Sequence, residues 1–231
     1  DPEHIAPGVN HEQVIEVYDH HHGFEQYWKD KIGEKAVIEM IGAAATLIWE
    51  EFINRGHAEN ISTTSANFLY TGIISNTLNF KASVTDQRDI TAAEQLSEHT
   101  NLPPNWIEIY YREQDEMLLA DIEKAVHEDT KVQYIDALEK ELVIGQMELW
   151  DSKAFVHDHA TEIKATLETY DNPDWFMTAP SISEGKNYFY SESEMVKELL
   201  KEIMEATFDG DFGTTPKLWL RKEILKELNL L

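Results

Sequence analysis

The chain has no cysteine, few glycines and prolines, and no long apolar run. Without cysteine it cannot form a disulfide framework or a thiolate-ligated zinc or iron–sulfur site. No stretch approaches the roughly 20 apolar residues that a membrane-spanning helix needs, so we expect a soluble protein. A cytoplasmic location fits the lack of cysteine. Because the chain begins with Asp1 rather than Met, a targeting segment cannot be judged.

Positive charge is also scarce. The chain has 19 Lys and Arg residues against 44 Asp and Glu, a formal net charge of −25 over 231 residues. Such a balance argues against a general binder of nucleic acid or of an anionic membrane. With 42% hydrophobic and 10% aromatic residues, the chain can still bury a core. The composition therefore predicts a globular protein of one large domain or two small ones.

Short β-branched runs alternate with helical patterns in the first half of the chain. We expect strands at residues 14–18 and 36–40, and helices at 41–53, 66–76 and from 86 onward. Strands that alternate with helices of this length are typical of βαβ units. The sequence therefore predicts an α/β fold with a mainly parallel sheet and flanking helices.

The second half predicts a smaller and more mixed α/β domain. A long charged helical stretch at 106–127 separates the halves, and we place the boundary within it, near residues 114–116. The predicted domains are then 1–115 and 116–231. The expected elements are strands at 141–148, 175–178 and 187–190, helices at 152–170 and 194–206, a turn at 209–213 and a closing helix after Arg221.

The clearest chemical motif is Asp19-His20-His21, directly after the first predicted strand. In parallel α/β sheets, ligands bind at the carboxyl ends of the strands. One carboxylate and two imidazoles can bind a divalent metal and leave a ring nitrogen for a substrate. The alternative is a polar surface turn that is rich in histidine.

Four stretches of the first half resemble the DHH phosphoesterase superfamily in order and spacing. They are VIEVYDHH (14–21), EMIGAAATLI (39–48), GIISNTLNFK (72–81) and TDQRDITAAEQL (85–96). In the second half, VIGQME (143–148) and LRK (220–222) resemble the associated domain of the manganese-dependent (family II) inorganic pyrophosphatases and the related exopolyphosphatases. The GGGH-type segment of the nucleotide phosphodiesterase branch is not found.

The resemblance implies roles for individual residues. Asp19 supports the metal site, His20 binds a metal, and His21 faces the substrate phosphate as the catalytic histidine. A metal-bridging carboxylate is expected at the position of Asn76, where an amide oxygen can bind a hard cation but adds no charge. A helix-capping or core-facing Asn76 is the alternative. Two divalent metals are expected, with Mn²⁺ first and Mg²⁺ or Co²⁺ able to replace it.

A larger departure from the family lies upstream of the motif. The family's His-x-x-x-Asp-x-Asp cluster and a further metal-bridging Asp do not occur before Asp19. Two βα units, each of about 30 residues, are missing relative to the family. We therefore expect the sequence to begin inside the family's first domain.

The same resemblance assigns substrate-binding cations near the end of the chain. Arg221 and Lys222 would bind phosphate, because guanidinium and ammonium groups both suit phosphate oxygens. Lys131 resembles another phosphate-binding lysine of this domain. Glu223 stands where the family continues its basic run, which weakens the attraction for a highly charged phosphate. A solvated helix start is the alternative reading of the pair.

These observations predict a metal-dependent hydrolase of a phosphoanhydride. Inorganic pyrophosphate is the leading substrate and a short polyphosphate the second, while no nucleic-acid or membrane partner is expected. A homodimer is compatible with the sequence. A degenerate member that binds phosphate or nucleotide without turnover is the alternative from another class, because of Asn76, Glu223 and the missing upstream carboxylates.

Overall fold

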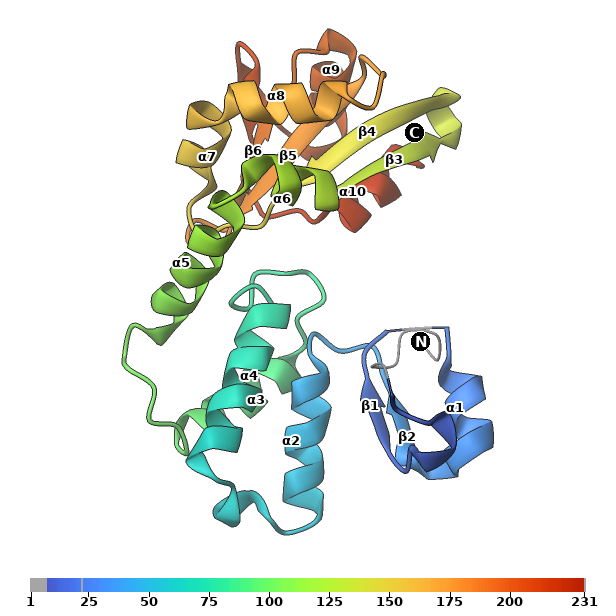
Figure 1. Cartoon of the computed structure of the whole chain (residues 1–231), viewed down its shortest axis with the longest axis vertical. Coiled ribbons are helices and arrows are strands. Elements are labelled where there is room, and N and C mark those ends of the chain that lie inside the picture. Colours follow the sequence, from blue (N-terminus) through green and yellow to red (C-terminus); the bar gives the residue numbers. More distant parts are fainter. Residues whose placement is uncertain (1–7, 22, 231) are drawn as a thin grey trace. The chain divides into compact units, whose positions relative to one another are not determined.

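The computed structural model describes residues 8–21 and 23–230, which form two compact units (Figure 1). The first unit covers residues 1–104 and the second covers 105–231. The division comes before α5 (Trp106–Leu119), a continuous helix, whereas the sequence analysis placed it inside this helix. The second unit is therefore the longer one, contrary to the expectation of a smaller domain.

A small βαβ unit opens the first unit. Strand β1 (Val17–Asp19) runs parallel to β2 (Ala36–Ile38), and α1 (Glu25–Ile32) connects them. The described part of this unit contains only these two strands, so the expected mainly parallel sheet is not observed. The motif at residues 19–21 nevertheless lies at the carboxyl end of β1, whose last residue is Asp19; its neighbour His22 lies outside the described residues.

Three helices build the core of the first unit. They are α2 (Ala44–Asn54), α3 (Thr63–Asn76) and α4 (Gln87–Ser97), close to the predicted ranges. Trp49, Ile73 and Leu96 are buried where these helices meet. Ser62 begins α3 as its N-cap by accepting the N–H of Ser65 at 3.0 Å.

The second unit is built on a mixed six-stranded sheet with the order β3-β4-β5-β6-β8-β7. Its strands are β3 (Thr130–Ile135), β4 (Lys140–Gln146), β5 (Trp175–Ser181), β6 (Lys186–Tyr190), β7 (Thr207–Asp209) and β8 (Phe212–Thr214). Only β4 and β5 pair in parallel, while the other neighbours are antiparallel. Short connections join β3 to β4, β5 to β6 and β7 to β8, and such connections produce antiparallel hairpins. This part of the fold is mixed, as expected, but not mainly parallel.

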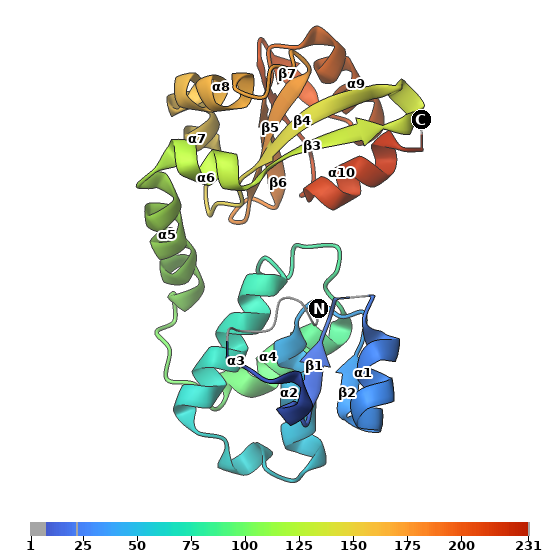
Figure 2. The ribbon, with the colours of Figure 1, turned by 45° about the vertical axis from the view of Figure 1, so that its right-hand side comes forward.

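Helices cover both faces of this sheet (Figure 2). One face carries α6 (Ile122–Glu128), α7 (Ser152–Asp158) and α8 (Ala160–Glu168), and the other carries α9 (Glu194–Met204) and α10 (Arg221–Leu228). Alternation along the strands supplies the two cores, since Val143 and Met177 face the first set while Ile144 and Phe176 face the second. The long apolar runs of β4 and β5 are explained by burial on both sides.

Each of two long predicted helices is divided in the structure. The stretch 106–127 contains α5 and α6, because Asp121 begins a new helix by accepting the N–H of Lys124 at 3.1 Å. The stretch 152–170 contains α7 and α8, which meet at His159. Helical periodicity identifies such stretches but does not reveal a change of axis between two short helices.

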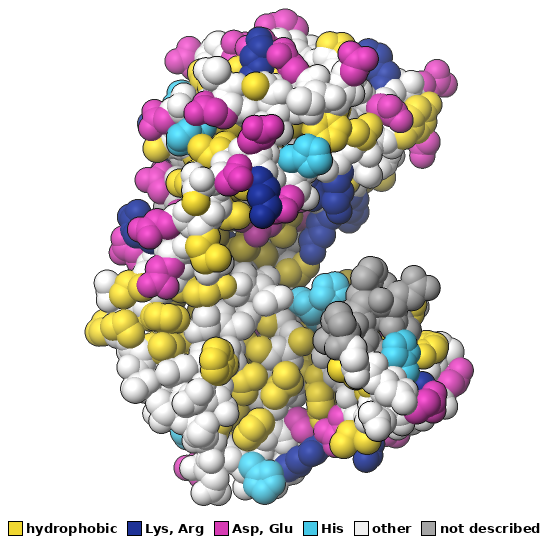
Figure 3. All heavy atoms as spheres, in the orientation of Figure 1, with side chains coloured by type: hydrophobic (Ala, Val, Ile, Leu, Met, Phe, Trp, Pro, Cys, Tyr) yellow, Lys and Arg dark blue, Asp and Glu magenta, His cyan; other side chains and the backbone are white. Residues whose placement is uncertain are grey.

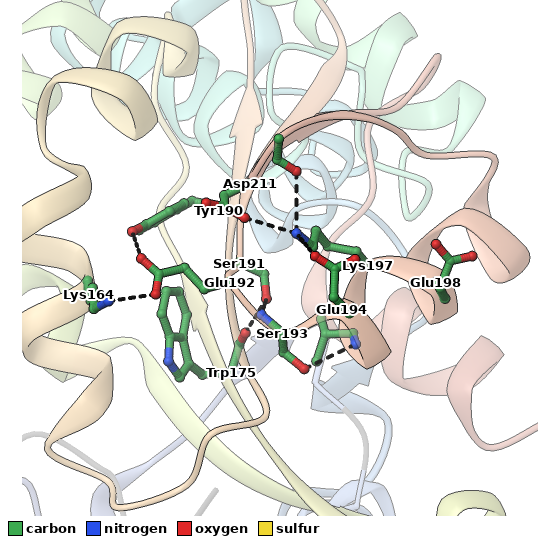
Figure 4. Close-up of polar contacts among 12 residues, drawn as sticks. Lys164, Trp175, Tyr190, Ser191, Glu192, Ser193, Glu194, Lys197, Glu198 and Asp211 are labelled. Carbon is green, nitrogen blue, oxygen red and sulfur yellow. Dashed lines mark hydrogen bonds and ion pairs between the residues drawn. The ribbon is translucent and has the colours of Figure 1, made fainter.

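A polar network joins α9 to the turn between β7 and β8 in the second unit (Figure 4). The ammonium of Lys197 is buried and contacts the carboxylates of Glu194 at 2.6 Å and Asp211 at 2.9 Å. Asp211 lies in the turn between β7 and β8, where Gly210 has φ +61°. The predicted turn at 209–213 is thus confirmed, and its carboxylate stabilises the fold.

The surface is acidic over much of the second unit. Asp and Glu side chains are spread across the face that Figure 3 shows, with no single acidic patch. Among the described residues, no helix combines the length and the apolar character required to cross a lipid bilayer.

Candidate functional site

The carboxylate of Asp19 organises the turn that follows β1. Its Oδ1 accepts hydrogen bonds from the backbone N–H groups of His20 at 2.7 Å and of His21 at 3.1 Å. Nδ1 of His21 donates a third bond at 2.7 Å. Burial alone would raise the pKa of Asp19, but these hydrogen bonds outweigh burial and lower the pKa below its usual value. Asp19 is therefore an ionised carboxylate that orients both histidines.

The ring of His20 is held through one nitrogen and leaves the other available. Nδ1 lies 3.2 Å from the carbonyl oxygen of Ile41, in the loop after β2. A carbonyl oxygen only accepts, so Nδ1 carries the proton and Nε2 of the neutral ring keeps its lone pair. Metal-ligating histidines commonly donate their second N–H to a backbone carbonyl. His20 thus has the arrangement of a histidine ligand.

His21 is the more accessible of the two histidines. Its side chain is 75% exposed, and its ring meets that of His20 edge-on with centroids 4.4 Å apart. Because Nδ1 donates to Asp19, Nε2 is the nitrogen that can accept or donate a proton toward a bound molecule. The three motif residues therefore lie together, as the sequence predicted.

A buried carboxylate from α4 fixes the loop that holds His20. The bonds to Asp89 come from the backbone N–H groups of Gly42 (3.0 Å), Ala43 (3.2 Å) and Asp86 (2.8 Å) and from the hydroxyl of Thr46 (2.6 Å). A Cβ on Gly42 would lie 2.5 Å from Oδ2 of Asp89, so only glycine fits there. Asp89 therefore fixes the segment that leads into α2 and positions the carbonyl of Ile41.

Asn76 is the last residue of α3 and is exposed. Its Nδ2 donates to the carbonyl oxygen of Gly72 at 3.0 Å, so the side chain is not core-facing. The backbone then passes through three left-handed residues, Leu78, Asn79 and Phe80, with φ of 48°, 53° and 63°. Such consecutive conformations are costly for non-glycine residues and cluster at functional sites. No glycine marks this turn, so the sequence did not predict it.

The donor chemistry of this region fits a divalent cation only in part. Asp19 and His20 offer oxygen and nitrogen donors that suit Mn²⁺, and Asn76 carries an amide oxygen. Within residues 8–21 and 23–230, however, no three His, Asp or Glu side chains converge into a complete metal site. A metal site with Asp19, His20 and Asn76 therefore stays a prediction.

The three predicted phosphate-binding cations lie at one corner of the second unit. Arg221 and Lys222 open α10, and Lys131 follows the start of β3. Lys131 lies on the same side of β3 as Ile135, which packs in the core beneath α10. Lys131 and Lys222 are exposed. Arg221 instead has a side chain only 10% exposed, with its guanidinium bonded to Asp129, so it is not part of a solvated helix start.

Two further residues at this corner were not predicted. Glu148 follows β4 and accepts a hydrogen bond from Nε2 of Gln146 at 3.0 Å. Burial raises the pKa of Glu148 to about 6, Asp129 adds to the rise, and Arg221 and Lys222 oppose it. The alternation of Gln146 and Glu148 within an otherwise apolar stretch is the signal that could have revealed them.

The architecture defines a chain of two α/β units, one with an Asp-His-His turn at a strand end and one with clustered cations. Among solved structures, it is similar to a proposed family II inorganic pyrophosphatase from Methanococcus jannaschii, with a TM-score of 0.51 and 19% identity. The match covers 84% of this chain and 66% of the other, just under two thirds. The fold is therefore shared, consistent with the resemblance of the motifs.

A second solved structure is an exopolyphosphatase-related protein from Bacteroides fragilis. It has a TM-score of 0.35 and 14% identity, and the match covers 84% of this chain and 57% of the other. No protein-family model and no curated protein sequence matches the chain.

Proposed function

We propose that the protein is a metal-dependent hydrolase of phosphoanhydrides, with inorganic pyrophosphate as its substrate. The observation that carries this proposal is the geometry of His20, whose Nδ1 donates to a backbone carbonyl while its Nε2 forms no hydrogen bond with the described residues. The fold shared with a proposed family II inorganic pyrophosphatase supports the same chemistry.

Each residue of the motif has a distinct task in this proposal. His20 holds a divalent cation through Nε2, and the amide oxygen of Asn76 is a further donor. Asp19 keeps His21 oriented through its bond to Nδ1. His21 contacts the phosphate through Nε2 and can donate a proton to a leaving oxygen. Divalent cations, when bound, lower the pKa of water and neutralise charge on the phosphate oxygens.

The second unit supplies the cations for the substrate. Lys131 and Lys222 are exposed and can reach phosphate oxygens with little reorganisation. Arg221 lies at the same corner, where it is paired with the Asp129 carboxylate. Polyphosphate is the second substrate to be tested, because its repeating unit presents the same phosphoanhydride bond.

Phosphate release from pyrophosphate in the presence of Mn²⁺ tests the proposal. We expect hydrolysis by the parent protein, its loss on chelation, and a fall of more than about 100-fold in His20→Ala, beyond the usual effect of losing an outer-shell partner. His57→Ala, an exposed histidine of the same unit, is the matched control and should keep parent activity.

A non-catalytic phosphate-binding protein is the second candidate function. The observation that favours it is the absence of a complete metal site among the described residues. Calorimetry distinguishes the two, because pyrophosphate binding without any phosphate release at saturating Mn²⁺ would establish the binder and refute the hydrolase.

A further inference from the structure

The side chain of Arg221 is committed to the protein itself. One terminal nitrogen, Nη1, donates to the carbonyl oxygen of Asp129 at 2.6 Å and approaches that of Ile144 at 3.4 Å. The other, Nη2, donates to the Asp129 carboxylate. The backbone N–H of Arg221 donates to Oε1 of Gln146 at 2.6 Å. These contacts attach the first residue of α10 to the ends of β3 and β4.

Lys222 differs sharply from Arg221, although the two are adjacent. It is exposed, and no ion pair involves its ammonium in the described part of the chain. Its charge still acts on the partly buried carboxylate of Glu148. At this corner, Asp129 neutralises Arg221, while Lys222 keeps its donors free for an anion.

A direct phosphate contact by Arg221 would have to disrupt this arrangement. Turning the guanidinium away would leave the Asp129 carboxylate without its ion-pair partner and would remove a donor from the Asp129 carbonyl oxygen, which also accepts the N–H of Gln146 at 3.0 Å. The pair is buried at Arg221 and 44% exposed at Asp129, and breaking it gives up charge-assisted bonds to both the carboxylate and the carbonyl of Asp129, of which one new phosphate contact regains only part.

We propose that Arg221 is a positioning residue, clamped by Asp129 and fixing the start of α10 so that Lys222 presents its ammonium to the substrate phosphate. The inference rests on the proposed function, since it assigns the roles of two cations toward that substrate. The inference gives different roles to Arg221 and Lys222, which the sequence pattern predicts to be equivalent phosphate ligands.

The inference is tested by whether Asp129→Asn raises or lowers KM for pyrophosphate. Asp129→Asn removes the charge that holds Arg221 and keeps the shape of the side chain. A positioning Arg221 is loosened by this change, so KM for pyrophosphate should rise several-fold with kcat little altered. If Arg221 were a direct ligand restrained by Asp129, the same substitution would free it and lower KM.

A double-mutant cycle with Lys222→Gln completes the test. Lys222→Gln alone should raise KM roughly ten- to a hundredfold, as expected for one charge-assisted contact. Adding Asp129→Asn or Arg221→Gln to it should raise KM no further, because both act through Lys222. Lys226→Gln, an exposed lysine of the same helix, is the matched control and should leave KM unchanged.

The outcomes separate this inference from the proposed function. Pyrophosphate hydrolysis by the parent with a lowered or unchanged KM in Asp129→Asn overturns the positioning role alone, as does a further rise in the double variants. A parent that neither binds nor hydrolyses pyrophosphate overturns both. If Arg221→Gln does not fold, Asp129→Asn still decides the question.

Discussion

Replacing Asp89 by Asn should destabilise the first unit and loosen its histidine site. The carboxylate accepts four hydrogen bonds, two at each oxygen, whereas an amide has only one accepting oxygen. In the least costly arrangement the new NH₂ group replaces Oδ1 and points toward Thr46, whose hydroxyl can rotate to accept its hydrogen bond. The N–H of Ala43, which also donated to Oδ1, then faces this NH₂ group and has no acceptor. The two bonds to the other oxygen no longer end on a charged group.

The expected cost is about 1.5–3 kcal/mol, the range for one charge-assisted hydrogen bond or one buried unsatisfied donor. For a unit of this size, each kcal/mol lowers Tm by roughly 4–8 °C. Thermal unfolding measures the global effect, and hydrogen exchange at the amides of Gly42 and Ala43 measures the local one. Glu94→Gln, an exposed carboxylate on the same helix, should change neither.

The same substitution should weaken manganese binding without removing a ligand. Asp89 positions the loop whose Ile41 carbonyl accepts from His20, so a loosened loop releases the imidazole from its orientation. Outer-shell losses of this kind cost roughly 10- to 100-fold in metal affinity. Parent-like Tm and unchanged protection of both loop amides in Asp89→Asn would refute the reasoning, because they would show that the four bonds do not hold the loop.

Three further predictions concern single residues. His20→Ala should strongly weaken Mn²⁺ binding measured by calorimetry, and equal affinity in variant and parent would remove His20 from the site. Asn76→Asp adds a negative ligand and should tighten binding of a second Mn²⁺; unchanged stoichiometry and affinity would place Asn76 outside the metal shell. Folding raises the pKa of Glu148 from 4.5 to about 6, so its ionised form opposes folding above that pH. Glu148→Gln should therefore raise the free energy of unfolding by up to about 2 kcal/mol at pH 8 and by almost nothing at pH 4. Denaturant unfolding measures both values, and an equal gain at the two pH values would contradict this prediction.

Elements with strong local signals were predictable from the sequence. The run that ends at Asp19 identified β1, and Ser62 and Asp86 are helix caps that place the starts of α3 and α4. The edge strand β3 gave no such signal. Its apolar residues Val132 and Tyr134 are exposed, so its sequence does not show the alternation of buried apolar and exposed polar residues that marks a half-buried strand. Strand direction also escaped prediction, since pairing depends on connections and not on composition.

The residues of the candidate site likewise fall into those that the sequence predicted and those that it did not. Asp19, His20 and His21 are consecutive, so their proximity follows from the sequence. Asp89 lies 47 residues from Gly42, and Asp129 lies 92 residues from Arg221. No local pattern links such pairs, and a buried carboxylate is indistinguishable from a solvated one until its donors are known. The residues that hold the site in place were therefore the ones that sequence reasoning missed.

Local charge, rather than the net charge of −25, would govern the proposed binding of phosphate at the start of α10. At physiological ionic strength the Debye length is about 8 Å, so most of the remote carboxylates are screened from a phosphate at this corner. The charges that remain effective are those of Lys131 and Lys222, opposed by Glu148, while Asp129 and Arg221 offset each other. Because the pKa of Glu148 lies near 6, its protonation on mild acidification removes one negative charge from this corner. The proposed phosphate site is therefore compatible with a strongly acidic chain.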